Sequence, residues 1–198
     1  QIMEKDKYKR LTREQIDGAI SFHGHLCPGL TIGARAAEWA LNEFGRAGDE
    51  DIVCVTETDM CGVDAIQFLT GCTFGKGNFI FRETGKIAFS FYRRRDGMRG
   101  RIVMRPNFAP ELAVKEATLA QDDAIGIQAL RQERIEQLWA DDIDEIFNYT
   151  EPRFNVPERA RIHATILCEE CGEGVMATKI VEGGGRKLCT DCAARRRA

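Results

Sequence analysis

Residues 22–41 read FHGHLCPGLTIGARAAEWAL, and this stretch joins a cluster of polar side chains to an apolar helix. Its second half predicts a helix from about Leu30 to Phe44, because apolar side chains recur there every three or four residues. These apolar positions are Leu30, Ala34, Ala37, Leu41 and Phe44. The helix therefore has one face to bury, and the segment HGHLCPG (residues 23–29) lies at its N-terminal end.

The HGHLCPG segment places two imidazoles and one thiol within five residues. In an extended chain, His23, His25 and Cys27 would project to the same side. Cys27 is also expected near the helix N-terminus, where the helix dipole favours the thiolate form. This set of donors suits either a soft transition-metal ion or a thiolate activated by a histidine. Packing of all three side chains within the core is the alternative interpretation.

A second group of polar side chains lies within residues 58–79, TDMCGVDAIQFLTGCTFGKGNF. A β-rich strand from Ile52 to Thr58 leads into it, and Val63 to Leu69 predicts a short helix. The turn from a strand into a helix is a frequent position for site residues. The candidate site residues here are Asp59, Cys61, Asp64, Cys72 and Lys76. Cys54 lies within the strand and is predicted to be a core residue.

The remaining elements indicate an α+β domain. Strands are predicted at Phe79–Arg82, Lys86–Tyr92 and Arg101–Arg105. Helices are predicted at Pro110–Ala120 and Ile127–Ala140, and one more strand within Ile143–Asn155. A short helix after the capping-box pattern at Thr12 precedes all of these. The order of helices and strands does not follow a regular βαβ repeat, which is why we expect an α+β class.

Two Cys-x-x-Cys knuckles, CEEC at 168–171 and CTDC at 189–192, lie near the C-terminus with seventeen residues between them. A hairpin of Val175–Val181 and Arg186–Leu188 would bring the knuckles together. Four thiolates in a closed tetrahedron are typical of a structural zinc site. The predicted ligands are Cys168, Cys171, Cys189 and Cys192. Local disulfides or unrelated thiols are the alternative, and zinc would supply the folding energy of so small a segment.

Composition and charge restrict the class of protein. The chain has 198 residues, eight cysteines, 28 basic and 31 acidic side chains, and a net charge of −3. This balance argues against a surface that binds polyanions, and acidic residues of the ribbon offset its arginines, so we do not expect nucleic-acid binding. The charged first ten residues and the lack of long apolar stretches predict no signal peptide and no membrane helix. We therefore expect a cytoplasmic protein with free or metal-bound thiols.

Several motifs together resemble the FmdE family, named for the FmdE component of molybdenum or tungsten formylmethanofuran dehydrogenase. They are FHGHLCPGLTIGARAAEWAL, TDMCGVDAIQFLTGCTFGKGNF, GKIAFSFYRR and the terminal four-cysteine ribbon. Residues 106–160 carry no motif that matches. The resemblance implies an α+β core with a mixed sheet, called FwdE/GAPDH-like, and a homodimer. It also implies that one pocket is lined by His25, Cys27, Cys61, Cys72 and Lys76, with His23 in the same motif.

These observations lead to one functional hypothesis and two alternatives. We expect an FmdE-like core at residues 1–165 and a zinc ribbon at 166–198. The first hypothesis is a metal-binding protein that is accessory to a one-carbon or molybdenum/tungsten enzyme system and could belong to such a complex. Beside structural zinc, a second transition-metal ion would lie at His23, His25, Cys27 and Cys61. The alternatives are a free-standing enzyme, with His25 or His23 as base and Cys27 or Cys61 as thiolate or ligand, and a nucleic-acid-binding regulator.

Overall fold

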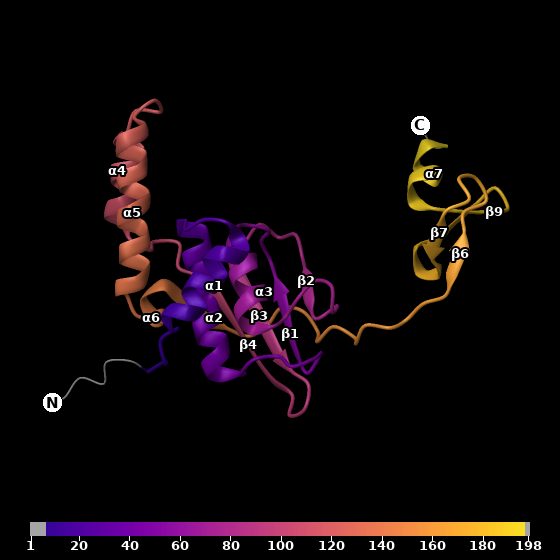
Figure 1. Cartoon of the computed structure of the whole chain (residues 1–198), viewed down its shortest axis with the longest axis horizontal. Coiled ribbons are helices and arrows are strands. Elements are labelled where there is room, and N and C mark those ends of the chain that lie inside the picture. The colour runs from indigo at the N-terminus through magenta and orange to yellow at the C-terminus, as the bar shows by residue number, and fades with distance from the viewer. Residues whose placement is uncertain (1–6, 197–198) are drawn as a thin grey trace. The chain divides into compact units, whose positions relative to one another are not determined.

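A five-stranded mixed sheet with the strand order β2-β1-β3-β4-β5 forms the centre of the larger of two units (Figure 1). The structure is a computed structural model that describes residues 7–196. By its internal contacts the chain divides after Arg159, and we call the two parts the core unit and the ribbon unit. The predicted division after residue 165 falls within a strand of the ribbon unit.

The core unit contains the helices and strands of the predicted α+β class. Its helices are α1 Arg13–His23, α2 Pro28–Glu43, α3 Gly62–Thr70, α4 Pro110–Thr118, α5 Ala124–Ala140 and α6 Ile143–Ile146. Its strands are β1 Ile52–Thr56, β2 Phe79–Phe81, β3 Ala88–Arg93, β4 Met98–Met104 and β5 Phe147–Thr150. β1 and β2 are parallel and the other neighbours are antiparallel, so the sheet is mixed as predicted.

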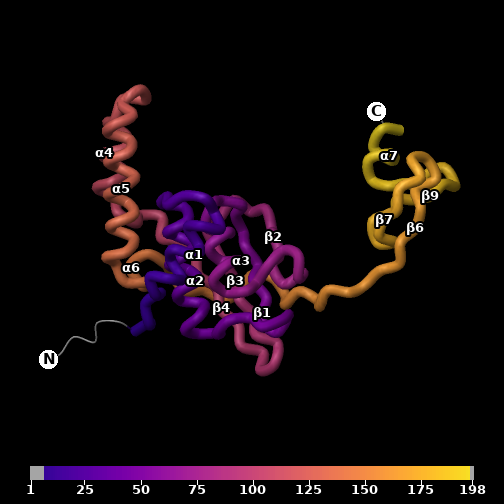
Figure 2. The backbone as a smooth tube through the Cα atoms, viewed as in Figure 1, coloured from indigo at the N-terminus to yellow at the C-terminus, as the bar shows by residue number. Residues whose placement is uncertain are grey.

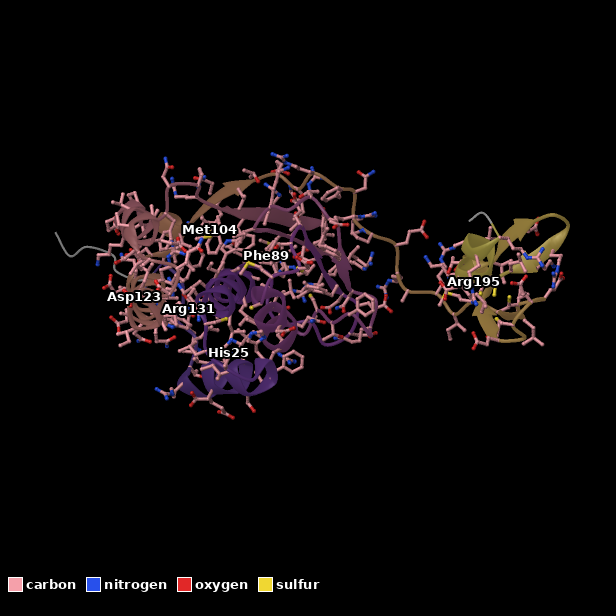
Figure 3. The ribbon with its side chains drawn as sticks, turned by 90° about the horizontal axis from the view of Figure 1, so that it is seen from above. His25, Phe89, Met104, Asp123, Arg131 and Arg195 are labelled. Atoms are coloured by element: carbon pink, nitrogen blue, oxygen red, sulfur yellow. The ribbon has the colours of Figure 1, made fainter. Side chains whose placement is uncertain are left out.

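One face of the sheet is covered by helices. Viewed from above, α2 and α3 lie against the sheet, and α1 packs on α3 (Figure 3). Alternate residues of β3 reach this layer: Phe89 and Phe91 are fully buried, and Phe91 packs edge-on against Trp39 of α2. Cys54 of β1 is fully buried in the same core, which confirms its predicted position. Burial raises the pKa of its thiol.

The other face of the sheet is covered by the extended segment that follows β5. Val53, Val55 and Tyr92 are buried on this face, and Phe154 packs against them. The Tyr92 hydroxyl donates a hydrogen bond of 2.6 Å to the Phe154 carbonyl. We call residues 151–159 the strap, because they hold to the sheet without forming a regular element.

Helices α4 and α5 form a hairpin beside the helical layer (Figure 2). The second half of α5 packs against α2, and the Arg35 guanidinium of α2 donates to the carbonyl oxygen of Asp141 at 2.7 Å. The predicted start of α5 at residue 127 is three residues late. The reason is Asp123, whose carboxylate accepts from the Gly126 amide and caps the helix earlier.

Two ion pairs are buried within the core unit. Arg101 of β4 donates to Glu57, after β1, at 2.6 Å, and both side chains are almost fully buried. Burial alone would raise the pKa of Glu57, but hydrogen bonds from Arg101 and Thr84 lower it below its usual value. Within α2, Arg35 pairs with Glu38 at 2.7 Å. Breaking such a pair would leave an unpaired charge in the interior.

The ribbon unit differs from the predicted single hairpin. Its elements are β6 Thr165–Leu167, β7 Gly174–Met176, a 3-10 turn Ala177–Lys179, β8 Val181–Gly183, β9 Arg186–Leu188 and α7 Thr190–Arg195. The predicted strand over 175–181 is wrong, because the 3-10 turn divides it. β7 pairs back with β6 across the first knuckle, while β8 pairs with β9.

The helices α2 and α3 approach so closely that one position admits glycine alone. A Cβ atom on Gly33 would lie 2.1 Å from the Gly62 carbonyl oxygen, which is backbone and cannot move aside freely. This contact holds the N-terminal part of α3 against α2. No part of the sequence pattern predicted which glycine would have this role.

We predict that Gly33→Ala lowers the free energy of unfolding of the core unit by about 1–3 kcal/mol, because an extra methyl group overpacks the helix crossing. Gly48→Ala is the matched control, since a Cβ there meets nothing within 4 Å. Urea unfolding followed by tryptophan fluorescence measures the difference, because both tryptophans, Trp39 and Trp139, belong to the core unit. Equal stability of the two variants would contradict the prediction.

Candidate functional site

Within the part of the chain that the structure describes, two groups of side chains are placed so that each could share a metal ion. The first is Cys168, Cys171, Cys189 and Cys192 in the ribbon unit, and the second is His23, His25 and Cys27 in the core unit. In each group the possible ligand atoms lie within 4.8 Å of one another. Both groups were predicted as metal ligands from the sequence.

The ribbon brings its four thiols together through two tight backbone turns. The first knuckle lies between β6 and β7, where Gly172 adopts a left-handed φ of 76°. The second lies at the start of α7, whose N-cap is Cys189. The backbone amide of Cys189 donates to the Cys168 sulfur at 3.3 Å. Such amide donors, from Cys171, Cys189 and Glu170, lower the pKa of Cys168 to about 6, which favours the thiolate that zinc requires.

Two arginines of the ribbon, Arg186 and Arg196, are paired with acidic side chains of the same unit. Arg196 forms an ion pair of 2.5 Å with Glu170, and Arg186 lies 3.8 Å from Glu169 and from Glu170. Arg195, labelled in Figure 3, donates weakly to the Asp191 carbonyl at 3.4 Å. Arg197 lies outside the described residues. The charge balance predicted for the ribbon is therefore reflected in local ion pairs.

The core cluster is built where α1 ends and α2 begins. His23 is the last residue of α1, and Gly24 ends the helix with a left-handed φ of 100°. The chain then reverses, and Cys27 becomes the N-cap of α2, as expected from its place in the sequence. His23, His25 and Cys27 meet through this turn and not through an extended strand, which corrects the predicted geometry while leaving the three side chains together.

His23 is oriented by a carboxylate from a third helix. Its Nδ1 lies 2.7 Å from Oδ2 of Asp64 in the first turn of α3, and its Nε2 lies 3.9 Å from the Cys27 sulfur. The Leu30 backbone amide donates to that sulfur at 3.3 Å. His25 is exposed, and its ring centroid lies 4.8 Å from that of His23. The nitrogen of His23 that faces the thiol is therefore set by the hydrogen bond at the other nitrogen.

Cys61 lies beside this cluster, just before α3. A Cβ atom on Gly29 would lie 3.1 Å from the Cys61 Cβ, so the start of α2 closely approaches this cysteine. Although Cys61 is exposed, partial burial and the neighbouring Cys27 thiol raise its pKa. The two cysteines thus interact even though Cys61 is not within the compact three-residue group.

The other predicted pocket residues lie elsewhere. Cys72 follows the C-terminal end of α3, roughly 13 Å of helix away from Cys61. It is fully buried, its thiol donates to the Ile52 carbonyl at 3.5 Å, and burial raises its pKa to about 11. Lys76 lies near Cys72, where its charge partly offsets that rise. Asp59 is exposed, and among residues 7–196 it forms no hydrogen bond or ion pair with the cluster.

Sequence reasoning named Asp64 as a pocket residue but did not foresee that it would orient His23. Asp64, in the first turn of α3, is 41 positions from His23, the last residue of α1. Only the packing of the helices brings these two side chains together. The sequence also predicted no site residues within residues 106–160, yet α4 and α5 form a cavity together with Pro28, the residue after Cys27.

Comparison with known proteins shows which families the two parts of the chain resemble. The model of a family described as "FmdE, Molybdenum formylmethanofuran dehydrogenase operon" matches residues 22–153, and the "Prokaryotic dksA/traR C4-type zinc finger" model matches residues 163–198. A crystal structure of an FmdE-like protein of the tungsten formylmethanofuran dehydrogenase type, from Syntrophus aciditrophicus, is similar, with a TM-score of 0.63 over 93% of each chain. At 23% identity, this likeness shows the fold.

A relative in sequence is a protein of Archaeoglobus fulgidus described as a probable S-adenosyl-L-methionine-binding protein. It is 31% identical over 96% of this chain, which in turn spans only 55% of the length of that relative. Among the described residues, no helix is both long and apolar enough to cross a membrane. The FmdE model, by contrast, matches well over half of the sequence together with the HGHLCPG cluster. The chain belongs to the FmdE family.

Proposed function

We propose that the protein binds a transition-metal ion at the core cluster, in addition to structural zinc in the ribbon, and serves as an accessory to a one-carbon or molybdenum/tungsten enzyme system. The observation that carries the proposal is the orientation of His23 by Asp64. A metal-bound histidine commonly donates its second ring N–H to a carboxylate, which fixes the ring and strengthens the ligand. Here that arrangement points Nε2 toward Cys27.

The spacing of the donor atoms supports an ion of the zinc, cobalt or nickel size. Tetrahedral zinc with nitrogen and sulfur ligands needs donor atoms about 3.6 Å apart, by the usual bond lengths. The core donors lie within 4.8 Å, so small side-chain rotations suffice. Cys61 would be the fourth ligand, because it lies beside Cys27. Mixed nitrogen and sulfur donors favour soft or borderline transition metals over magnesium or calcium.

The exposure of the cluster favours a second candidate function, a free-standing thiol- or metal-dependent enzyme. His25 and Cys61 are exposed, so a small molecule can reach the site from solvent. In this alternative His23 or His25 would act as the base, and Cys27 or Cys61 as the thiolate or metal ligand. Copurification with a molybdenum or tungsten enzyme would favour the accessory function, whereas turnover by the isolated protein would favour the enzyme.

The ribbon is proposed to have a structural function, and a nucleic-acid-binding regulator is the least favoured alternative. Arg186 and Arg196 form ion pairs with Glu169 and Glu170, which reduces the positive charge that the ribbon can offer to phosphates. We also propose a homodimer. It is supported by four exposed apolar side chains, Phe22, Leu26, Phe68 and Phe74, of which Phe22 and Phe68 lie against each other with ring centroids 6.0 Å apart.

Cys171→Ser should remove about one zinc ion per chain and unfold the ribbon unit, because the metal supplies its folding energy. The zinc content is measured by mass spectrometry of the dialysed full chain, and the ribbon by amide hydrogen exchange. The core unit should keep its unfolding midpoint, as reported by its two tryptophans. A variant that retains a protected ribbon without zinc would refute a structural site.

Cys27→Ser should also remove about one metal ion per chain, but from the core, while the ribbon stays folded. The two serine variants are controls for one another, since each should lose a different ion. Cobalt substitution tests the ligands, because a thiolate-to-cobalt charge-transfer band should weaken in Cys27→Ser and in Cys61→Ser. A single zinc per chain that survives both core changes would sink the proposal.

Asp64→Asn should weaken metal binding at the core by about 10- to 100-fold, because the neutral amide still accepts from His23 but no longer raises its basicity. The affinity is measured by competition with a chelating dye after the ribbon has been filled with zinc. Asp59→Asn is the matched control, as it removes the same charge five residues away without contacting His23. Equal losses in both variants would mean that only net charge matters.

A further inference from the structure

A cavity of about 350 Å³ lies where the α4–α5 hairpin meets the start of α2. Its lining includes Pro28, which follows Cys27, and side chains from both helices of the hairpin. The volume is at the lower end of the range for small-molecule sites. Nothing in the metal proposal uses this cavity, since none of its lining residues is a proposed metal ligand.

The walls of the cavity are mainly apolar. Leu119 comes from the end of α4, Ile127 and Leu130 come from the first half of α5, and Pro28 closes the side toward the core. Leu130 is 7% exposed, whereas Leu119 and Ile127 are only half-buried. Half-buried apolar side chains around a hollow favour a ligand with an apolar body.

The charged side chains of the lining leave one positive charge without a partner. Arg134 is engaged, because it pairs with Glu116 across the hairpin at 2.6 Å. Arg131 is exposed and, among the residues the structure describes, forms no ion pair or hydrogen bond. The lining therefore combines apolar walls with one free guanidinium.

We propose that this cavity binds a small organic anion with an apolar body, whose acid group is held by Arg131. An arginine fork matches a carboxylate or phosphate with two parallel hydrogen bonds, while the apolar body is buried between the helices. A macromolecular partner fits less well, because a stable protein interface needs about 800 Å² from each partner. Binding of this ligand does not depend on the proposed metal ion at the core cluster.

Titration calorimetry of the full chain with octanoate tests the proposal, with octanol and octylammonium as matched probes of the same apolar length. Octanoate should bind and both other probes should bind at least fivefold more weakly. Arg131→Gln should weaken octanoate binding about tenfold, because a charge-assisted hydrogen bond is lost. Arg95→Gln is the control, since it removes the same charge from the exposed turn between β3 and β4.

Ala120→Trp gives a second test, because this exposed lining residue can carry a ring into the cavity without disturbing the core. It should abolish octanoate binding while the unfolding midpoint stays unchanged. Octanoate binding that is absent, or that survives both Arg131→Gln and Ala120→Trp, would overturn the inference. Cys27→Ser should bind octanoate as the unaltered protein does. The proposal of a core metal ion and the proposal of a ligand in the cavity can therefore be contradicted independently.

Discussion

The crossing of α2 and α3 is the constraint on which the core cluster depends. Gly33 meets the backbone of Gly62, and Gly29 lies against the Cys61 side chain, so the two helices are in close contact near their N-terminal ends. That contact puts the start of α3 beside the start of α2. Asp64 can then reach His23, and Cys61 can reach Cys27. A larger residue at the crossing would separate ligands that come from different helices.

The arginines of the core unit show how little of an arginine-rich sequence is available for ligands. Arg101 is buried against Glu57, Arg93 donates to the carbonyl oxygens of Glu43 and Phe44, and Arg94 donates to that of Glu50. These guanidiniums join the β3–β4 hairpin to its neighbours. Arg131, in contrast, belongs to no motif and has no partner among the described residues.

Local patterns predicted the elements of this fold better than they predicted contacts between elements. The α2 helix, the β3 strand and the two cysteine knuckles each lie within a short window, and all three were correctly identified. The prediction that α2 has one face to bury was wrong, because every residue from Leu30 to Ala40 is buried. Helix starts shifted where a side chain capped the helix, as Asp123 does for α5. The ribbon was mispredicted because strand pairing across the first knuckle is a contact between separate segments.

In the candidate site, too, groupings of residues that are close in sequence were easier to predict than contacts between separate elements. His23, His25 and Cys27 are neighbours in sequence, so their grouping was foreseeable, whereas the approach of Asp64 depends on packing over 41 positions. Cys72 belongs to the same sequence motif as Cys61, but a helix lies between them and carries the two thiols to opposite ends. Proximity along a motif therefore overestimated how many of its residues share one pocket.

The strap has a consequence for where the core unit ends. The last regular element of this unit stops at Thr150, yet Phe154 still covers Val53 and Val55, and its carbonyl still binds Tyr92. A chain ending with the last strand would leave one face of the sheet in water, which costs about 25 cal/mol for each Å² of apolar surface exposed. The smallest independently folding piece of this protein is thus defined by a segment that has no secondary structure of its own.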